Sequence, residues 1–208
     1  MRIESISRVG NKTDKYSVLF DNGDDICASV AQIADFGLHT GLELSDEDYA
    51  RVIEGVKLGS AKARAMRILG NRSLSATEME RRLVGKGETQ EIARATVEWL
   101  VGIGAINDDE YAAAIVRHYC SKGYGIARIR DELYRRGIPR DIWDDALSGV
   151  DGMADAADEF LRKRLGGSRD KDDLRRAADA LFRRGFSYDE ARDAVNRFLE
   201  SYEETEEI

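Results

Sequence analysis

The chain has 208 residues, of which 42% are hydrophobic and 35% charged, and its formal net charge is −8. This content suffices for one large domain or a few small ones, whereas the acidic total argues against a general nucleic-acid binder, whose affinity depends on neutralising phosphates. We find no apolar signal-peptide core and no run of membrane-spanning length, and Cys27 and Cys120 indicate neither a disulfide framework nor a metal site. We therefore expect a cytoplasmic protein with no membrane partner.

Charge is unevenly distributed along the chain. Residues 1–55 carry 5 basic and 11 acidic side chains, residues 56–199 carry 27 and 24, and residues 200–208 carry five glutamates and no base. The centre of the chain is therefore mildly basic, and both of its ends are acidic.

Residues 1–44 predict a small β-rich region. Three strand-like runs occupy residues 2–9, 16–20 and 25–30, and Asn22-Gly23 between the last two is a strong hairpin signal because both residues tolerate positive φ. A short helix is expected over 30–36. We expect an antiparallel sheet that packs on the next segment of the chain, because three short strands are marginal alone.

A connecting helix is predicted over residues 45–60. Ser45 is a suitable N-cap, with Asp48 three residues later, and apolar residues recur at helical spacing. Gly55 and Gly59 leave the end of this helix uncertain.

The phrase Leu-x-x-x-Gly then occurs three times, at residues 83–87, 133–137 and 181–185. Its spacing is typical of a helix end, where glycine takes the left-handed conformation after the last turn. Apolar residues at matching offsets before and after each phrase, and separations of 50 and 48 residues between the leucines, predict tandem helical repeats. We expect an elongated array of three three-helix repeats over 61–104, 105–150 and 151–202, followed by a disordered acidic tail over 203–208.

No catalytic site emerges from the sequence. His39 and His118 are the only histidines, and neither has the neighbours of a triad or of a metal site. The aspartate pairs at helix starts are explained by capping. We expect no catalytic, cofactor-binding or metal-binding residues, and no enzymatic activity.

Basic residues recur on the middle helix of each repeat. Cations near the carboxyl end of a helix are favoured by its dipole, each by roughly 0.3–1 kcal/mol, so the dipole explains any single cation there. It does not explain Arg128, Arg175 and Arg176, which lie earlier in the same helices. The third helices are acidic in every repeat, however, and this segregation makes the middle helices a candidate partner-binding face. Its residues are Arg82, Lys86, Arg128, Arg135, Arg136, Arg175, Arg176, Arg183 and Arg184.

With these residues in view, the chain resembles the regulatory protein RecX family, modulators of the RecA recombinase. The resemblance covers roughly Ala61 to Leu199 and is carried by LVGKG at 83–87, GAINDDEYA at 104–112 and LFRRGF at 181–186. It implies an all-helical repeat array that binds the RecA filament on single-stranded DNA, dampens its ATPase and strand exchange, and so acts in DNA repair and the SOS response. It also implies a monomer with no cofactor and at most weak direct DNA contact. The alternative is a helical-repeat nucleic-acid-binding protein that uses the middle helices on DNA directly.

Overall fold

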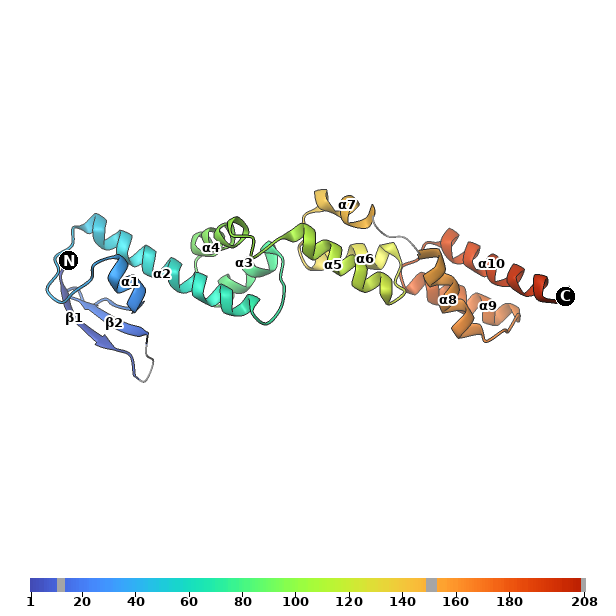
Figure 1. The fold of residues 1–208 in the computed structure, drawn as a ribbon, viewed down its shortest axis with the longest axis horizontal. Coiled ribbons are helices and arrows are strands. Elements are labelled where there is room, and N and C mark those ends of the chain that lie inside the picture. The colour runs from blue at the N-terminus through green and yellow to red at the C-terminus, as the bar shows by residue number, and fades with distance from the viewer. Residues whose placement is uncertain (11–13, 149–152, 207–208) are drawn as a thin grey trace. The chain divides into compact units, whose positions relative to one another are not determined.

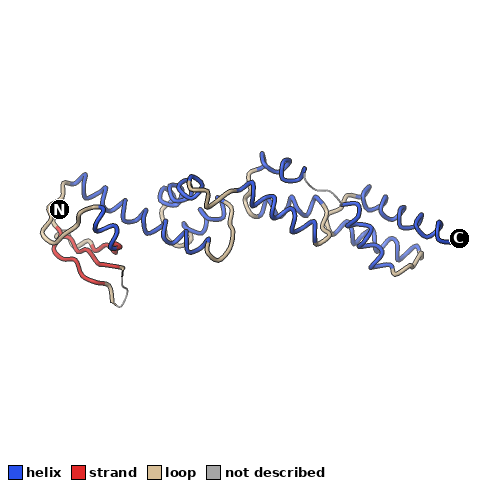
Figure 2. Tube along the Cα trace, viewed as in Figure 1, coloured by secondary structure: helices blue, strands red, loops and turns tan. Residues whose placement is uncertain are grey.

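The computed structural model describes residues 1–10, 14–148 and 153–206. It divides into two compact units, one formed by Met1–Ser73 with Met79–Ile106 and the other by Leu74–Glu78 with Asn107–Ile208. The described part holds ten α-helices and one 3-10 helix, all of which come after three strands (Figure 1; Figure 2). The predicted fold class, mainly α after a small antiparallel sheet, is confirmed.

The first unit begins with a three-stranded antiparallel sheet. Strands β1 (Ile3–Arg8), β2 (Lys15–Phe20) and β3 (Asp25–Ser29) lie in the order β1-β2-β3, and helix α1 (Val30–Asp35) comes directly after them. The predicted hairpin turn is present, with Gly23 at a φ of 88°, which glycine adopts without a Cβ penalty. The sheet shares one core with helix α2 (Asp46–Leu69), and the buried members of that core are Ile3, Val18, Phe20, Ala28, Leu38, Val52 and Val56.

Helix α2 corrects the prediction of a separate connecting helix over 45–60. It runs from Asp46 to Leu69 without interruption and therefore includes the first helix of the first repeat (Figure 1). Its two central glycines are packing positions instead of a helix end. A β-carbon at Gly55 would lie 2.3 Å from Cζ of Phe36, and one at Gly59 would lie 2.4 Å from Nε2 of Gln32. The side chains of Gln32 in α1 and of Phe36, its C-cap, therefore pack directly over these two glycines.

The buried residues of α2 lie on two different faces of the helix. Val52 and Val56 belong to the sheet core, whereas Ala61 and Ala65 are fully buried further along. At about 100° per residue, Val52 and Ala61 point in directions about 180° apart. The second half of α2 contacts helix α4 (Gln90–Gly102), and α2 therefore serves two cores from opposite sides.

The three Leu-x-x-x-Gly phrases close the middle helices of the repeats, which are α3 (Ala76–Val84), α6 (Ile126–Arg135) and α9 (Lys171–Arg183). Their glycines, Gly87, Gly137 and Gly185, have φ values of 93°, 66° and 93°. The amide after each glycine donates to the carbonyl of the repeat leucine, at 3.1 Å in the first copy, 3.0 Å in the second and 3.2 Å in the third. These are the hydrogen bonds of a Schellman cap, and the predicted helix ends are confirmed.

The second unit contains two separate cores. One is enclosed by α5 (Asp108–Ser121), α6 and a third segment made of η1 (Arg140–Ile142) and α7 (Trp143–Ser148). The other is enclosed by α8 (Met153–Leu165), α9 and α10 (Tyr188–Glu206). Each repeat of this unit therefore packs around its own apolar side chains.

Two predicted elements differ from the structure. The third helix of the second repeat is a 3-10 turn with a short α-helix after it, and it begins beyond Pro139, whose ψ of 140° is extended. Helix α10 continues to Glu206, so residues 203–206 are helical instead of disordered, because glutamate favours helix and no glycine or proline interrupts it. The predicted boundary at 150/151 and residues 207–208 lie outside the described residues.

Candidate partner-binding surface

All nine predicted cations lie on the middle helices or in their caps. Arg82 and Lys86 belong to the first unit and are exposed. The other seven belong to the second unit, where they separate into two groups. The exposed group is Arg135, Arg175, Arg176 and Arg183, and the half-buried group is Arg128, Arg136 and Arg184. Arg128 and Arg184 lie where the second and third repeats join, whereas Arg136 lies against side chains of its own repeat.

The start of α6 is joined to the end of α9 by backbone alone. The amide of Gly125 donates to the carbonyl of Arg184 at 2.9 Å, and the amide of Ala127 donates to that of Gly185 at 3.1 Å. These are groups that a helix leaves without internal partners at its two ends. The approach excludes side chains, because a β-carbon at Gly125 would lie 2.2 Å from the carbonyl carbon of Gly185. The amino end of α6 and the carboxyl end of α9 therefore cap each other.

The start of α3 meets the end of α6 in the same way, one repeat earlier, through side chains. The hydroxyl of Ser75 donates to the carbonyl of Arg136, and that of Thr77 donates to the carbonyl of Gly137 at 2.8 Å. The amide of Ala76 donates to a carboxylate oxygen of Asp108 at 2.9 Å. Ser75 and Thr77 stand eight and six residues before their repeat leucine, as Gly125 and Ala127 do. The α3/α6 and α6/α9 junctions therefore lie at equivalent positions of successive repeats. Side-chain hydroxyls make the hydrogen bonds at the first, and backbone amides make them at the second.

Arg136 is held within its own repeat. Its Nε donates to Glu132 at 2.7 Å and its terminal nitrogen donates to the hydroxyl of Tyr111. Glu132 is only 4% exposed and also accepts from Arg135 at 2.8 Å. Arg135 reaches this carboxylate from the surface, whereas Arg136 contributes to the interior of the repeat.

The pKa shifts in this cluster keep the Glu132 carboxylate and the Arg136 guanidinium charged. Burial alone would raise the pKa of Glu132, but the hydrogen bond from Arg136 and the positive charges of both arginines lower it below its ordinary value. Burial opposes the charge of Arg136 too, yet its bonds to Glu132 and Tyr111 raise its pKa. Burial raises the pKa of the Tyr111 hydroxyl, so that group stays protonated.

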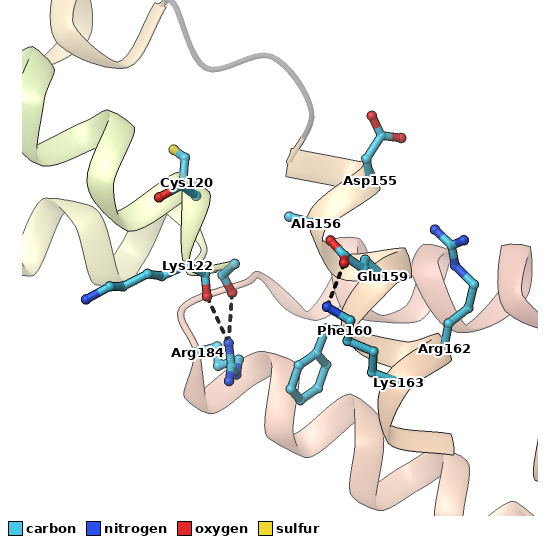
Figure 3. A pocket seen from close by; sticks show the side chains of 11 residues that line it. Cys120, Lys122, Asp155, Ala156, Glu159, Phe160, Arg162, Lys163 and Arg184 are labelled. Atoms are coloured by element: carbon cyan, nitrogen blue, oxygen red, sulfur yellow. Dashed lines mark hydrogen bonds and ion pairs between the residues drawn. The ribbon is translucent and has the colours of Figure 1, made fainter. Parts of the chain in front are cut away.

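Arg184 occupies the place of Arg136 in the third repeat, but its side chain contacts the second repeat. Its guanidinium donates to the carbonyl oxygens of Lys122 at 3.2 Å and Gly123 at 3.3 Å, as Figure 3 shows. It also lies 4.4 Å from the ring centre of Phe160 and 5.5 Å from that of Tyr124, within the range of a cation–π contact. Arg136 and Arg184 therefore connect elements of the second unit.

Apart from Arg135, which is bonded to the buried carboxylate of Glu132, the exposed arginines are engaged weakly or not at all. Arg175 and Arg176 pair with Asp172 at 3.8 Å and Asp173 at 3.3 Å, each within one turn of α9. Such surface pairs are worth little and exchange readily for other partners. In the part of the chain that the structure describes, Arg183 has no ion-pair partner. These side chains are available to a ligand.

Sequence reasoning missed a recurring exposed apolar side chain. The residue after each repeat leucine is Val84, Tyr134 or Phe182, and all three are exposed. The signal was present in the repeat phrase, where every copy has a large apolar residue at this position. An exposed apolar side chain beside exposed arginines is typical of protein-binding surfaces.

Neither a metal site nor a membrane span is found among the described residues. They include no group of three His, Cys, Asp or Glu side chains placed to hold a metal ion. No helix in the same ranges has the length and apolar composition needed to cross a membrane. His39 and His118 are both exposed, on different units.

Comparison with known proteins gives one family. Residues 107–147 match the model of the RecX second three-helix domain, inside the predicted second repeat. A regulatory protein RecX of Xanthomonas campestris pv. campestris is 38% identical over 140 residues, which are 66% of this chain and 86% of the relative. That of Mycolicibacterium vanbaalenii is 29% identical over 177 residues, 79% of this chain and 96% of the relative.

A solved structure has the same fold. The crystal structure of a regulatory protein RecX matches with a TM-score of 0.69 at 21% identity, covering 92% of this chain and 97% of the other. Together with the 38% identity to the Xanthomonas relative, this means that the chain belongs to the RecX family of regulatory proteins.

Proposed function

We propose that this protein binds the RecA filament on single-stranded DNA in the cytoplasm and dampens its ATPase and strand exchange, and so regulates DNA repair and the SOS response. The observation that carries the proposal is membership of the RecX family. The protein acts as a monomer through binding, without a cofactor or catalysis of its own.

The exposed arginines of the second unit are the proposed contact. Arg135 and Arg183 stand at equivalent positions of α6 and α9, and Arg175 and Arg176 extend the positive surface along α9. Several exposed charges acting together steer encounter with a negatively charged filament. In the first unit Arg82 and Lys86 present the same chemistry. Arg184 joins the third repeat to the second, Arg136 joins two helices within the second, and Arg128 lies against Gly185.

The alternative is that the same arginines bind single-stranded DNA directly. The exposed cations of α9 favour it, but exposed carboxylates occupy the same helix at Asp172 and Asp179, and they repel phosphate. Filter binding to single-stranded DNA across a salt series, with and without RecA, separates the two, because direct phosphate contacts give a steep salt dependence.

The decisive test is the ATPase of RecA on single-stranded DNA with this protein titrated in. We expect the steady-state rate to fall with added protein. The double variant Arg175→Glu, Arg183→Glu should require a higher concentration for the same effect, and its circular dichroism should match wild type, since both side chains are exposed and neither bonds to a buried group. Wild-type protein that leaves the ATPase unchanged refutes the proposed function.

A further inference from the structure

An apolar groove opens between α9 and α10 of the third repeat. Its volume is about 430 Å³, and its apolar lining is Leu174, Ala178, Phe182, Tyr188, Ala191 and Val195. Two of these side chains are unusually exposed for aromatic residues, Phe182 at 65% and Tyr188 at 74%. A hollow with this lining and volume is typical of a binding site, and paired exposed rings mark an interaction surface.

The second repeat shows which side chains fill the equivalent position. At the 48-residue offset between the repeats, Trp143 corresponds to Ala191 and Arg140 to Tyr188. The Trp143 indole is anchored by a hydrogen bond from its Nε1 to the carbonyl of Ile138 at 3.0 Å. The guanidinium of Arg140 lies 5.6 Å from the Trp143 ring and 5.9 Å from the ring of Tyr134, the counterpart of Phe182.

The third repeat therefore lacks the two groups that cover this surface in the second. Alanine replaces the indole, and the cation over the exposed ring is gone. The faces of Phe182 and Tyr188 are electron-rich and attract a cation, while the space beside Ala191 suits a large apolar side chain. The chain's own second repeat is thus a template for the missing occupant.

The groove is lined by charges of both signs, from Arg175, Arg192 and Asp179. Arg175 is paired with Asp172, and Arg192 with Asp189 and Asp193. The carboxylate of Asp179, which also lines the groove, has no ion-pair partner within the ranges that the structure describes. A carboxylate without a partner beside two aromatic faces repels phosphate and attracts arginine or lysine. A cation carried by the occupant would therefore pair with Asp179 and lie over the aromatic faces.

We propose that the α9/α10 groove receives a segment of a partner protein that inserts one large apolar side chain together with one cation. This inference rests on the proposed function, in that the segment is taken to be presented by RecA in its filament. The groove would supply apolar anchoring, while the exposed arginines of α6 and α9 supply electrostatic steering. Few buried anchors carry most of the energy of an interface.

The test uses the full chain and RecA filaments on single-stranded DNA. The double variant Phe182→Ala, Tyr188→Ala removes the exposed rings, and Asp179→Lys reverses the charge of the groove. Val101→Ala is the control, because Val101 is an exposed apolar side chain, 50% accessible, on α4 and outside the candidate partner-binding surface. All substituted side chains are exposed, so circular dichroism and the melting temperature should stay at wild-type values.

We expect the concentration of protein that halves the RecA ATPase to rise at least tenfold in the double variant, with Asp179→Lys shifted in the same direction and Val101→Ala unchanged. The factor for the double variant should be equal at low and high salt, because apolar anchoring is not screened. Inhibition by the double variant at wild-type concentrations overturns the groove proposal and leaves the proposed function standing. Wild-type protein without effect on RecA overturns both.

Two further outcomes identify a different occupant and overturn the proposal. In the first, the double variant loses affinity for single-stranded DNA alone by the same factor as for RecA filaments, and the occupant is then a stack of bases. In the second, wild-type protein forms a dimer by light scattering that the double variant does not form, and the occupant is then a second copy of the chain.

Discussion

The junction between α6 and α9 allows a sharp test of how repeats are held together. Gly125 has a φ of −79° and a ψ of 167°, which alanine adopts without strain. The only obstacle to Gly125→Ala is therefore the next repeat, since the new methyl group would lie 2.2 Å from the carbonyl carbon and oxygen of Gly185. Any loss of stability in Gly125→Ala therefore reports the contact with Gly185 and not a backbone conformation that only glycine can adopt.

The expected loss can be worked out from the contacts that must move. Separating the two helix ends breaks the hydrogen bonds from Gly125 to Arg184 and from Ala127 to Gly185, each worth about 0.5–1.5 kcal/mol net. Alanine restores about 0.4–1 kcal/mol by restricting the unfolded chain, while overpacking costs about 1–3 kcal/mol. Together these terms predict that the free energy of unfolding falls by about 3 kcal/mol.

Urea unfolding monitored by far-ultraviolet circular dichroism measures this loss. Gly102→Ala is the matched control, because it ends α4 and its added β-carbon would meet no atom within 4 Å; it should be as stable as wild type or slightly more so. Hydrogen exchange at the Ala127 amide should quicken in Gly125→Ala alone. A Gly125→Ala protein that unfolds at the wild-type urea concentration refutes the junction as described.

Three further predictions concern neighbouring features. Arg184→Ala should lower the free energy of unfolding by about 1–3 kcal/mol through its lost hydrogen bonds, whereas Arg183→Ala should change it by less than about 0.5 kcal/mol and weaken RecA inhibition; equal melting temperatures would contradict this contrast. Glu132→Gln should cost about 1–3 kcal/mol at pH 7 in urea unfolding. Because the folded pKa of Glu132 is lowered, its contribution is present above the unfolded pKa of about 4.3 and lost as pH falls through the folded pKa, so wild type and variant should converge in acid; a constant gap would contradict the assignment. Removing residues 203–208 should leave the melting temperature unchanged, since the last buried side chain described on α10 is Phe198; a large drop would show that the end of the helix docks.

The helix ends were predictable because their signals are local. The left-handed glycine and the apolar residues near it decide a Schellman cap within a few residues, and Gly137 and Gly185 obey that rule. The Asn22-Gly23 turn is equally local. For these elements the sequence contains all the physics that matters.

The functional separation of adjacent arginines was not predictable. The helix dipole favours Arg183 and Arg184 alike, and only the position of the next repeat places Arg184 against the carbonyls of Lys122 and Gly123 and leaves Arg183 outside. The sequence left the helix end at Gly55 and Gly59 uncertain for the same reason, since their role depends on α1 packing across α2. In both cases the role of the residue depends on which element packs against it in the folded chain, and no local sequence pattern encodes that packing.

The two-faced helix α2 sets a strict rule for length changes in the first unit. One added residue between Val56 and Ala61 would turn everything beyond it by about 100° and shift it by about 1.5 Å, so that Ala61 and Ala65 would no longer face their core while Val52 and Val56 faced theirs. Near-whole turns, such as about seven residues for two turns, restore the angle only at the expense of about 10 Å of added length. A single helix thus fixes the rotation of the first repeat's core relative to the sheet core. The segment between Val56 and Ala61 should therefore tolerate substitution far better than insertion or deletion.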